Sequence, residues 1–479
     1  MDSSKKLKVL FISLNKGYRG YYIPFGVFIL EAYISKQLKN VEIKISDYNC
    51  DNWIDVFLEF KPDIVGISLS TLTLDIARQA AEQIKKINPK ALIIVGGPHV
   101  SALPEHTLNY PFFDVGFLGE AEKPLTEFLK KYLIFKKIIS QKYKAIPGII
   151  LKTKKGIFIN KKLDYIQNLD EIPYINYAKA NLGHYLAKNQ AIRAVRPMRT
   201  FTMMTSRGCP YNCFFCASGV ISRRNVRYNS AKYVIKYIEL LYDKYKVKGI
   251  YFHDDLFIAN KERTKEICEY LIKSGLNKKI KWACQVRTEV VLNSKDILSL
   301  IKEAGCVQFE FGFESGNNRI LKLLKGCSVN VTDNQKAIDL TFKHDIKIYG
   351  NFMFGNYSET TKEMQDTIDF IEKNIDKLNF YYVYAANPLP GTDWWKKASF
   401  DPDNFDYERL GDNDKNPKSF TRTLSDSELK KYLNKINFLA YQKMPISAKM
   451  GWFFNEIFKR PRYVLYRLYT FLEMANFNF

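Results

Sequence analysis

Three cysteines with the spacing of metal ligands lie near the middle of the 479-residue chain, in Cys209-x₃-Cys213-x₂-Cys216. They directly follow a short apolar stretch, 201–205, that is typical of a strand. Structural zinc normally takes four ligands, and the next cysteine downstream is Cys268, so a zinc site would lack its fourth ligand here. A cubane iron–sulfur cluster held by three thiolates keeps one open iron that can chelate a small molecule. The spacing therefore favours a [4Fe–4S] cluster.

Strand-like and helix-like segments alternate on both sides of these cysteines. About six such βα units predict a partial (β/α)₆ barrel, whose active site would lie at the carboxyl ends of its strands. The expected strands are 201–205, 248–254, 280–286, 307–313, 346–353 and 379–385.

Several further motifs follow these strands in a recognisable order, and with the cysteines they resemble the radical S-adenosylmethionine (SAM) superfamily. They are Tyr251–Phe257, Phe311–Gly316, Ile320–Gly326, Phe352–Gly355, Ser358–Thr360 and Pro388–Thr392, with Asn356-Tyr357 replacing the usual proline of the strand-five motif. The resemblance implies that the open iron binds the amino and carboxylate groups of SAM. One electron then cleaves SAM to methionine and a 5′-deoxyadenosyl radical.

Polar residues at the expected strand ends are candidates for holding SAM, which carries an ammonium, a carboxylate and ribose hydroxyls. Asp254 and Asp255 suit the ammonium, while Glu314 and Ser315 suit the ribose or the ammonium. The full set is Phe215, Asp254, Asp255, Gln285, Arg287, Glu314 and Ser315. For each carboxylate the alternative is a salt bridge to one of the many lysines. No catalytic residue is assigned.

The first third of the chain shows a second alternating pattern, typical of a doubly wound parallel sheet. Its glycine- and serine-bearing loops fall at the carboxyl ends of the strands, where such sheets bind ligands. The expected strands are 7–14, 41–46, 63–70, 91–95 and 114–118.

This N-terminal region resembles the cobalamin-binding domain that precedes the barrel in one radical SAM subclass, a flavodoxin-like (Rossmann-type) fold. The D-x-H-x-x-G motif that supplies a histidine to cobalt is absent, so we expect cobalamin bound without its own base or a protein histidine on cobalt, and His99 as a loop-ordering residue. The alternative is a degenerate cover that binds nothing. The candidate cobalamin residues are Tyr22, Pro24, Gly26, Ser68, Ser70, Thr71, Gly96, Gly97, Pro98, His99, Val100, Gly119 and Glu120.

These patterns divide the chain into four parts. We expect a cobalamin-binding domain over 1–135, a linker with a hairpin over 136–198, the barrel over 199–400 and a helical region over 401–479. The N-terminus does not read as a signal peptide, and no apolar run is long enough to span a membrane. A cytoplasmic protein with reduced thiols is therefore expected.

The formal net charge of +23 is compatible with nucleic acid, an anionic membrane or an acidic substrate as partner. Lysines scattered over helix faces explain most of it without any such partner. The exception is the stretch 441–479, where six Lys/Arg accompany two Glu and eleven aromatic residues. It is either an amphipathic membrane-surface segment or a cap over the barrel. Membrane association is thus an open alternative, and nucleic acid is not expected.

Methylation of an unactivated carbon, with methylcobalamin as methyl donor, is the leading functional hypothesis from the resemblance. The substrate would be a small or lipid-like molecule, and the electron donor a flavodoxin or ferredoxin. One alternative is a cobalamin-dependent cyclase, oxidase or rearrangement enzyme. Another is a tRNA-modifying methylthiotransferase, although that group carries additional N-terminal cluster cysteines and only Cys50 precedes Cys209 here.

The cysteine spacing makes a direct prediction. Anaerobically reconstituted protein should carry about four irons per chain, and Cys213→Ala should lose them because a cubane needs every available thiolate. Iron and sulfide analysis with the visible absorption spectrum measures both. Stoichiometric zinc without iron would contradict the cluster.

Overall fold

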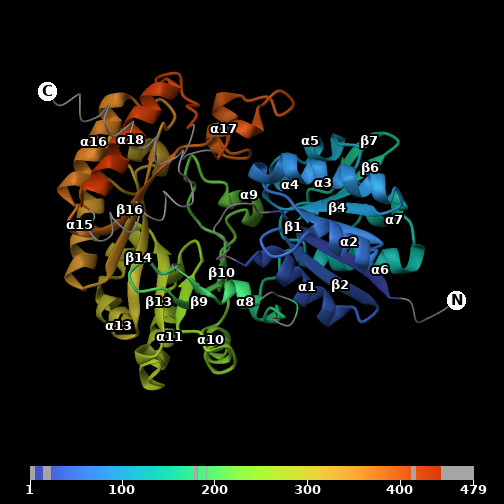
Figure 1. The fold of residues 1–479 in the computed structure, drawn as a ribbon, viewed down its shortest axis with the longest axis horizontal. Helices are drawn as coiled ribbons and strands as arrows, with labels where there is room; N and C mark the ends of the chain where they lie inside the picture. The colour runs from blue at the N-terminus through green and yellow to red at the C-terminus, as the bar shows by residue number, and fades with distance from the viewer. Residues whose placement is uncertain are drawn as a thin grey trace.

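The computed structural model describes residues 6–14, 23–176, 179, 182–189, 191–411 and 417–443. These residues form two α/β units that lie side by side, each built on a seven-stranded sheet (Figure 1). The N-terminal unit carries the blue and teal elements, and the second unit carries the green to red ones. The two-domain architecture expected from the sequence is confirmed.

The first sheet has the order β2-β1-β3-β4-β5-β6-β7, and its first five strands are parallel. Each of these strands is a short apolar run, as sheets covered on both faces require. Helices α1 (Phe25–Gln37) and α6 (Glu122–Phe135) contact each other on one face, while α2 (Trp53–Phe60) and α3 (Leu74–Ile87) pack on the other. The parallel strands are β1 (Leu7–Ser13), β2 (Val41–Asp47), β3 (Ile64–Ser68), β4 (Leu92–Gly96) and β5 (Val115–Phe117).

The expected linker hairpin belongs to this first sheet. Strand β6 (Ile149–Thr153) pairs antiparallel with β5, and β7 (Gly156–Ile159) pairs antiparallel with β6. Ile149, Ile150 and Leu151 are completely buried, so the hairpin covers the apolar edge that β5 would otherwise expose. The first domain therefore extends beyond the boundary expected at residue 135.

The second sheet has the order β16-β15-β14-β13-β12-β9-β8, and the six strands from β9 to β16 are parallel neighbours. Strand β8 (Lys188–Asn189) adds an antiparallel edge. This sheet is the expected partial barrel, and its main helices are α10 (Ala231–Tyr245), α11 (Lys261–Lys273), α15 (Val331–Lys343) and α16 (Thr361–Lys373). Its parallel strands are β9 (Met198–Met203), β12 (Gly249–Phe252), β13 (Lys281–Val286), β14 (Cys306–Glu314), β15 (Lys347–Phe354) and β16 (Leu378–Ala385).

Short elements fill the seam between the two sheets. The ribbon of β10 (Ser206–Arg207) and β11 (Arg227–Tyr228) flanks the cysteine loop, and α9 (Ser218–Ser222) contacts α4 (Pro98–Ala102) of the first domain (Figure 1). The loops that follow β3, β4 and β5 therefore face the loops that follow the first barrel strands.

The chain after the barrel is helical where it is described. Helix α17 (Asp393–Ala398) packs beside the cysteine loop, and α18 (Asp426–Lys443) packs against α16 and β16. Within the described ranges no helix is long and apolar enough to cross a membrane. Residues 444–479, which include nearly all of the basic–aromatic stretch, lie outside the described residues.

Candidate active site

A cavity of about 680 Å³ opens at the seam between the two domains. Its first wall is built from the loops after β3, β4 and β5 together with the start of α1. Its second wall is the ribbon, the cysteine loop and the end of β12, so both cofactor regions expected from the sequence border one space. The lining residues expected from the sequence are Gly26, Ser68, Ser70, Thr71, Gly96, Gly97, Pro98, Gly119, Glu120 and Asp255.

Glycines shape the first wall for close approach by a bulky ligand. Gly97 has φ = 110°, and a Cβ there would lie 2.7 Å from the carbonyl oxygen of Leu69. A Cβ at Gly26 would meet no atom within 4 Å, so it would project into the open cavity. Ser68 and Ser70 supply hydroxyls beside these glycines. A broad ligand with polar substituents, as cobalamin is, fits this wall.

His99 supports this wall from behind and does not line the cavity. The ring is completely buried, and its Nδ1 lies 3.1 Å from the Thr71 hydroxyl. Its backbone N–H donates to the carbonyl of Leu69, which joins the loop after β4 to the loop after β3. Burial, with a smaller contribution from His106, lowers the pKa of His99 to about 3. The structure therefore places His99 where the loop-ordering role needs it.

Of three other residues expected to contact cobalamin, two do not line the cavity and the third is not among the described residues. Val100 is completely buried in the core behind the sheet. Pro24 precedes α1 and is not among the lining residues. Tyr22 lies outside the described residues.

Glu120 lines the cavity, but its carboxylate is held by two arginines of the barrel domain. Arg207 donates from Nη1 to Glu120 at 2.8 Å and from Nη2 to Glu122 at 2.7 Å. Arg227 binds Glu120 through both terminal nitrogens. Burial opposes ionisation of Glu120, but the two arginines outweigh it and lower its pKa. We call Glu120, Glu122, Arg207 and Arg227 the interdomain clamp; the sequence interpretation of Glu120 as a cobalamin ligand missed this role.

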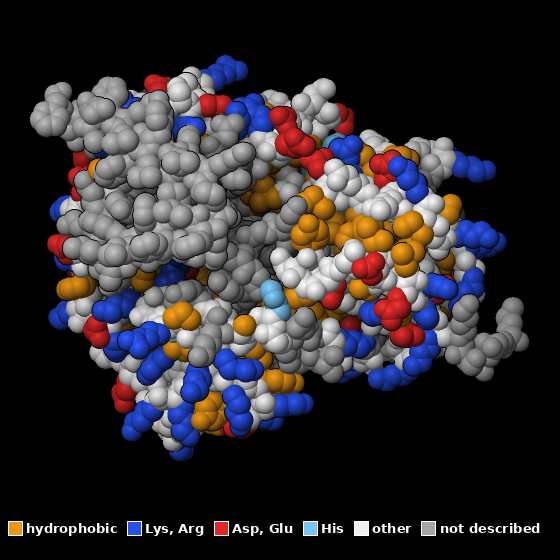
Figure 2. All heavy atoms as spheres, viewed as in Figure 1, with side chains coloured by type: hydrophobic (Ala, Val, Ile, Leu, Met, Phe, Trp, Pro, Cys, Tyr) orange, Lys and Arg blue, Asp and Glu red, His pale blue; other side chains and the backbone are white. Residues whose placement is uncertain are grey.

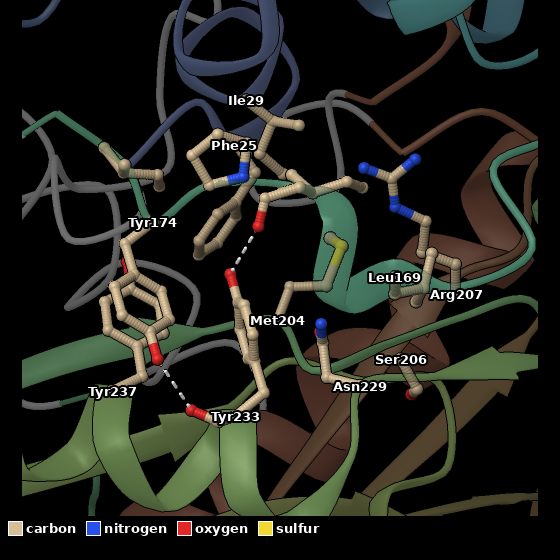
Figure 3. Close-up of a pocket in the computed structure, with 13 residues that line it drawn as sticks. Phe25, Ile29, Leu169, Tyr174, Met204, Ser206, Arg207, Asn229, Tyr233 and Tyr237 are labelled. Carbon is tan, nitrogen blue, oxygen red and sulfur yellow. Dashed lines mark hydrogen bonds between the residues drawn. The ribbon is translucent and has the colours of Figure 1, made fainter. Parts of the chain in front are cut away.

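Tyrosines close the rest of the seam (Figure 3). The hydroxyl of Tyr233 donates to the Ile172 carbonyl at 3.0 Å, and that of Tyr174 donates to the Tyr233 carbonyl at 3.1 Å. They border a second cavity of only about 40 Å³, which shares Phe25 and Arg207 with the large one. The connector is thus pinned to α10, and the open space is concentrated beside the cysteines.

The cysteine loop is fixed by a glycine turn at its start and by two backbone hydrogen bonds at Phe214. Gly208 has φ = 88°, and a Cβ there would meet the Asn225 carbonyl oxygen at 2.5 Å, so the turn into the loop requires glycine. The Phe214 N–H donates to the Leu324 carbonyl, and the Trp394 N–H donates to the Phe214 carbonyl. The apolar residues Phe214 and Phe215 pack together with Trp394.

The three thiols suit a cluster better than a single ion. All three are free thiols, and burial raises the pKa of the half-buried Cys209, so a nearby cation would favour its ionisation. In the described part of the chain no three Cys, His, Asp or Glu side chains are grouped to hold one metal ion. Ligands of a cubane each bind a different iron, so they need not converge on one point.

The neighbouring aspartates Asp254 and Asp255 have different partners. Both carboxylate oxygens of the buried Asp254 accept hydrogen bonds from Thr205 and Ser206, at 2.5–2.6 Å. Asp254 therefore holds the end of β9 and does not face the cavity, which corrects its assignment to SAM. Asp255 is exposed at the cavity and accepts from the Ser218 hydroxyl at 2.7 Å.

Glu314 and Ser315 are also occupied by the protein itself. The Lys325 ammonium lies 3.5 Å from Glu314 Oε1, with both side chains nearly buried. The Ser315 hydroxyl contacts Thr367 and accepts from the Asn317 N–H. Glu314 thus forms a salt bridge with a lysine, which was the alternative to SAM binding.

Arg287 and Gln285 point to different places from the end of β13. Arg287 donates from Nη1 to Cys213 Sγ at 2.9 Å and pairs with Glu289 at 2.6 Å. Gln285 donates to the hydroxyl of Tyr251 inside the barrel at 3.3 Å. Arg287 therefore lies beside the cluster loop, whereas Gln285 belongs to the barrel interior.

Sequence reasoning did not identify Arg207 and Arg227 as site residues. The only local sign of a role for Arg207 is its position directly before Gly208 and Cys209. Its two partners, Glu120 and Glu122, lie 87 and 85 residues earlier in the chain. A lone arginine is common on any surface, so its burial is visible only in the fold.

The interdomain clamp makes a stability prediction. Glu120→Ala should lower the free energy of unfolding by about 3–5 kcal/mol, because it leaves the buried Arg227 without its ion-pair partner and Arg207 with Glu122 alone. Urea denaturation measures the change. The control is Glu127→Ala, whose half-exposed pair with Lys131 on α6 should contribute at most about 1 kcal/mol.

The same clamp should be sensitive to acid. Because the folded-state pKa of Glu120 lies below its ordinary value of 4.5, its contribution is complete above that value and is lost as the pH falls through the folded pKa. The difference in free energy of unfolding between the wild type and Glu120→Gln should therefore become smaller as the pH is lowered. A gap that stays constant down to acid unfolding would contradict the clamp.

Comparison with known protein families and structures agrees with this geometry. Residues 15–129 match the B12 binding domain, and residues 203–371 match the Radical SAM superfamily. An uncharacterised methyltransferase of Pyrococcus horikoshii is 31% identical over 382 residues, which cover 78% of each chain. The anaerobic magnesium-protoporphyrin IX monomethyl ester cyclase of Cereibacter sphaeroides is 25% identical, over 73% of this chain and 55% of its own length.

The fold is shared with a solved structure of the same class. The radical SAM methyltransferase TsrM from Kitasatospora setae superposes with a TM-score of 0.66 at 16% identity, over 82% of this chain and 75% of that one. The cofactors implied by the two matching families are cobalamin, SAM and a [4Fe–4S] cluster. A cobalamin-type cradle and a three-cysteine loop facing one cavity, joined to these relationships, show that the chain belongs to the cobalamin-binding radical SAM enzymes.

Proposed function

We propose that this enzyme methylates an unactivated carbon of a small-molecule substrate. The observation that carries the proposal is the single cavity lined by Gly97 and Ser68 on one side and by Gly208 and Ser218 on the other. When bound, the cofactors supply a 5′-deoxyadenosyl radical on the cysteine side and a methyl group on the glycine side. A substrate in this space would lie between the two.

The residues proposed to hold each group follow from the site geometry. Cys209, Cys213 and Cys216 would bind the cluster, with Arg287 donating to the ligand sulfur of Cys213. Among the carboxylates expected from the sequence to bind SAM, Asp255 lines the cavity and would bind the SAM ammonium. The cobalamin wall would be Gly26, Ser68, Ser70, Thr71, Gly96, Gly97, Pro98 and Gly119.

The proposed domain boundaries take the hairpin into account. The cobalamin-binding domain would run to Ile159, the connector to about residue 197, the barrel from Met198 to Ala385 and the helical region from there on.

Cyclisation is the second candidate, favoured by the similarity to the cyclase of Cereibacter sphaeroides. It would use the same cavity and the same cofactor residues. The two reactions differ in whether the product gains a carbon, and a flavodoxin or ferredoxin would deliver the electron in both.

Residues 441–479 are proposed, from composition alone, to contact an anionic membrane surface and help load a membrane-resident substrate. Flotation with anionic and neutral vesicles, using the full chain and a chain ending at Gln442, tests this. Six Lys/Arg should produce a salt-sensitive preference for anionic vesicles in the full chain only.

The placement of His99 predicts the state of the bound cobalt. Cob(II)alamin in this protein should show no nitrogen superhyperfine splitting by EPR, because cobalamin is expected to bind without its own base on cobalt and because His99 is buried behind the wall and bonded to Thr71. His99→Gln should leave that spectrum unchanged. Splitting from an axial imidazole in the wild type that His99→Gln removes would show a histidine ligand.

The reaction itself is tested with labelled SAM. Anaerobic turnover with methyl-deuterated SAM should yield a product heavier by one labelled methyl group, together with 5′-deoxyadenosine and S-adenosylhomocysteine. Mass spectrometry detects all three. A product without the label, formed with 5′-deoxyadenosine, would favour cyclisation over methylation.

A further inference from the structure

The barrel strands turn a polar set of side chains into the lumen. On β14, Phe309, Phe311 and Phe313 are completely buried in the core shared with the outer helices, whereas the alternate residue Glu310 faces inward. The inward residues of neighbouring strands meet it there. They are Tyr251 and His253 on and after β12, Gln285 on β13 and Asn351 on β15.

Glu310 is the centre of this set. Its Oε2 accepts from the Tyr251 hydroxyl at 2.6 Å, and its Oε1 accepts from Asn351 Nδ2 at 2.9 Å. Gln285 Nε2 donates to the Tyr251 hydroxyl at 3.3 Å. Side chains from three neighbouring strands therefore orient this carboxylate, Tyr251 and Asn351 directly and Gln285 through the Tyr251 hydroxyl, and its position is fixed by the barrel itself.

Within the described ranges, the carboxylate of Glu310 has no cationic partner. No lysine, arginine or histidine among the described residues forms an ion pair with it, in contrast to Glu120 and Glu314. The nearby His253 does not supply a charge, because burial lowers its pKa below the ordinary value of 6.5. A partly buried carboxylate surrounded by neutral groups favours a cation from outside.

Two of the acceptor side chains in the lumen, Glu310 and Asn351, have positions left for further hydrogen bonds. An ionised carboxylate has about four acceptor positions, of which the two hydrogen bonds to Glu310 use two. Asn351 Oδ1 is buried and has no hydrogen-bond partner in the described part of the chain. A group with several N–H donors and no acceptor, such as an ammonium or amidinium, would satisfy Glu310 and Asn351 together.

The polar set adjoins the large cavity through His253. Ala191 and Ile192 pack against Tyr251 from below, and the Ala194 N–H donates to Gln308. Gln285, Glu310 and Asn351 keep part of their surface exposed, although they point into the barrel. His253, two residues beyond Tyr251 on the same face, lines the cavity between the domains.

We propose that Glu310 is a substrate-recognition residue that binds a cationic nitrogen group, an ammonium, amidinium or guanidinium. The proposal rests on the proposed function, since it anchors the nitrogen in the lumen and leaves the reacting carbon of the same molecule toward the cavity. It narrows the substrate class to nitrogen bases, because a purely apolar lipid would leave Glu310 without a partner.

The test compares cationic probes with neutral molecules of the same shape. Benzamidine against benzamide, and guanidinium against urea, are titrated calorimetrically into anaerobic holoenzyme loaded with cluster, cobalamin and SAM. At least one cation should bind about tenfold or more tightly than its neutral counterpart, since its hydrogen bonds to Glu310 are charge-assisted. Glu310→Gln should abolish this preference and Glu310→Asp should retain part of it. Glu266→Gln, an exposed position on α11, should match the wild type.

Two results would overturn the assignment. One is a wild type that binds neither cation more tightly than its neutral counterpart. The other is Glu310→Gln protein, with wild-type iron content and circular dichroism, that keeps the full preference. Release of 5′-deoxyadenosine by the wild type without any probe is measured separately. A wild type that releases none would contradict the proposed function, while the titrations still decide the role of Glu310.

Discussion

The buried pairing of Glu120 with Arg207 and Arg227 is the interaction on which the arrangement of the site depends. Charges removed from water are tolerated only when each meets an opposite charge in good geometry, so the partners cannot separate at low cost. Glu120 lies at the end of the loop after β5, and Arg207 lies two residues before Cys209. The clamp therefore fixes the cobalamin wall and the cysteine loop as one unit.

The topology explains why these two walls meet. Parallel strands carry all their carboxyl-end loops to one edge of a sheet, and each domain places that edge at the seam. Ligand-binding loops of the two sheets thus face each other across the large cavity. In Figure 2 this seam is the hollow between the right-hand domain and the barrel, beside the undescribed residues drawn in grey.

The acidic residues of the site fall into two groups, which differ in where their partners come from. Asp254, Glu120 and Glu314 are satisfied by N–H groups, arginines or a lysine of the chain, so they build the site. Asp255 and Glu310 have hydroxyl or amide partners and no ion pair among the described residues; Asp255 lines the large cavity, and Glu310 is partly buried in the barrel. Carboxylates of the second kind keep their charge available to a cationic ligand.

The sequence by itself determined the features that depend on local pattern. Short apolar runs separated by helix-length segments predicted both sheets to within a few residues, and the spacing of Cys209, Cys213 and Cys216 limited the metal chemistry. Glycines such as Gly97 marked the loop that a ligand approaches, because only glycine adopts φ = 110° freely.

Only the tertiary structure decided which partner each functional side chain meets. Glu120, expected at cobalamin, meets arginines 87 and 107 residues away, and Asp254, expected at SAM, is bound by residues 48 and 49 positions earlier. The hairpin Ile149–Ile159, expected in a linker, joins the first sheet because β5 has an apolar edge to cover. The residue type determines which groups a side chain can bind. Which of these groups it does bind depends on how distant parts of the chain pack around it. The strand period already turns Glu310 inward, yet its lack of a counter-charge becomes visible only when the whole barrel surrounds it.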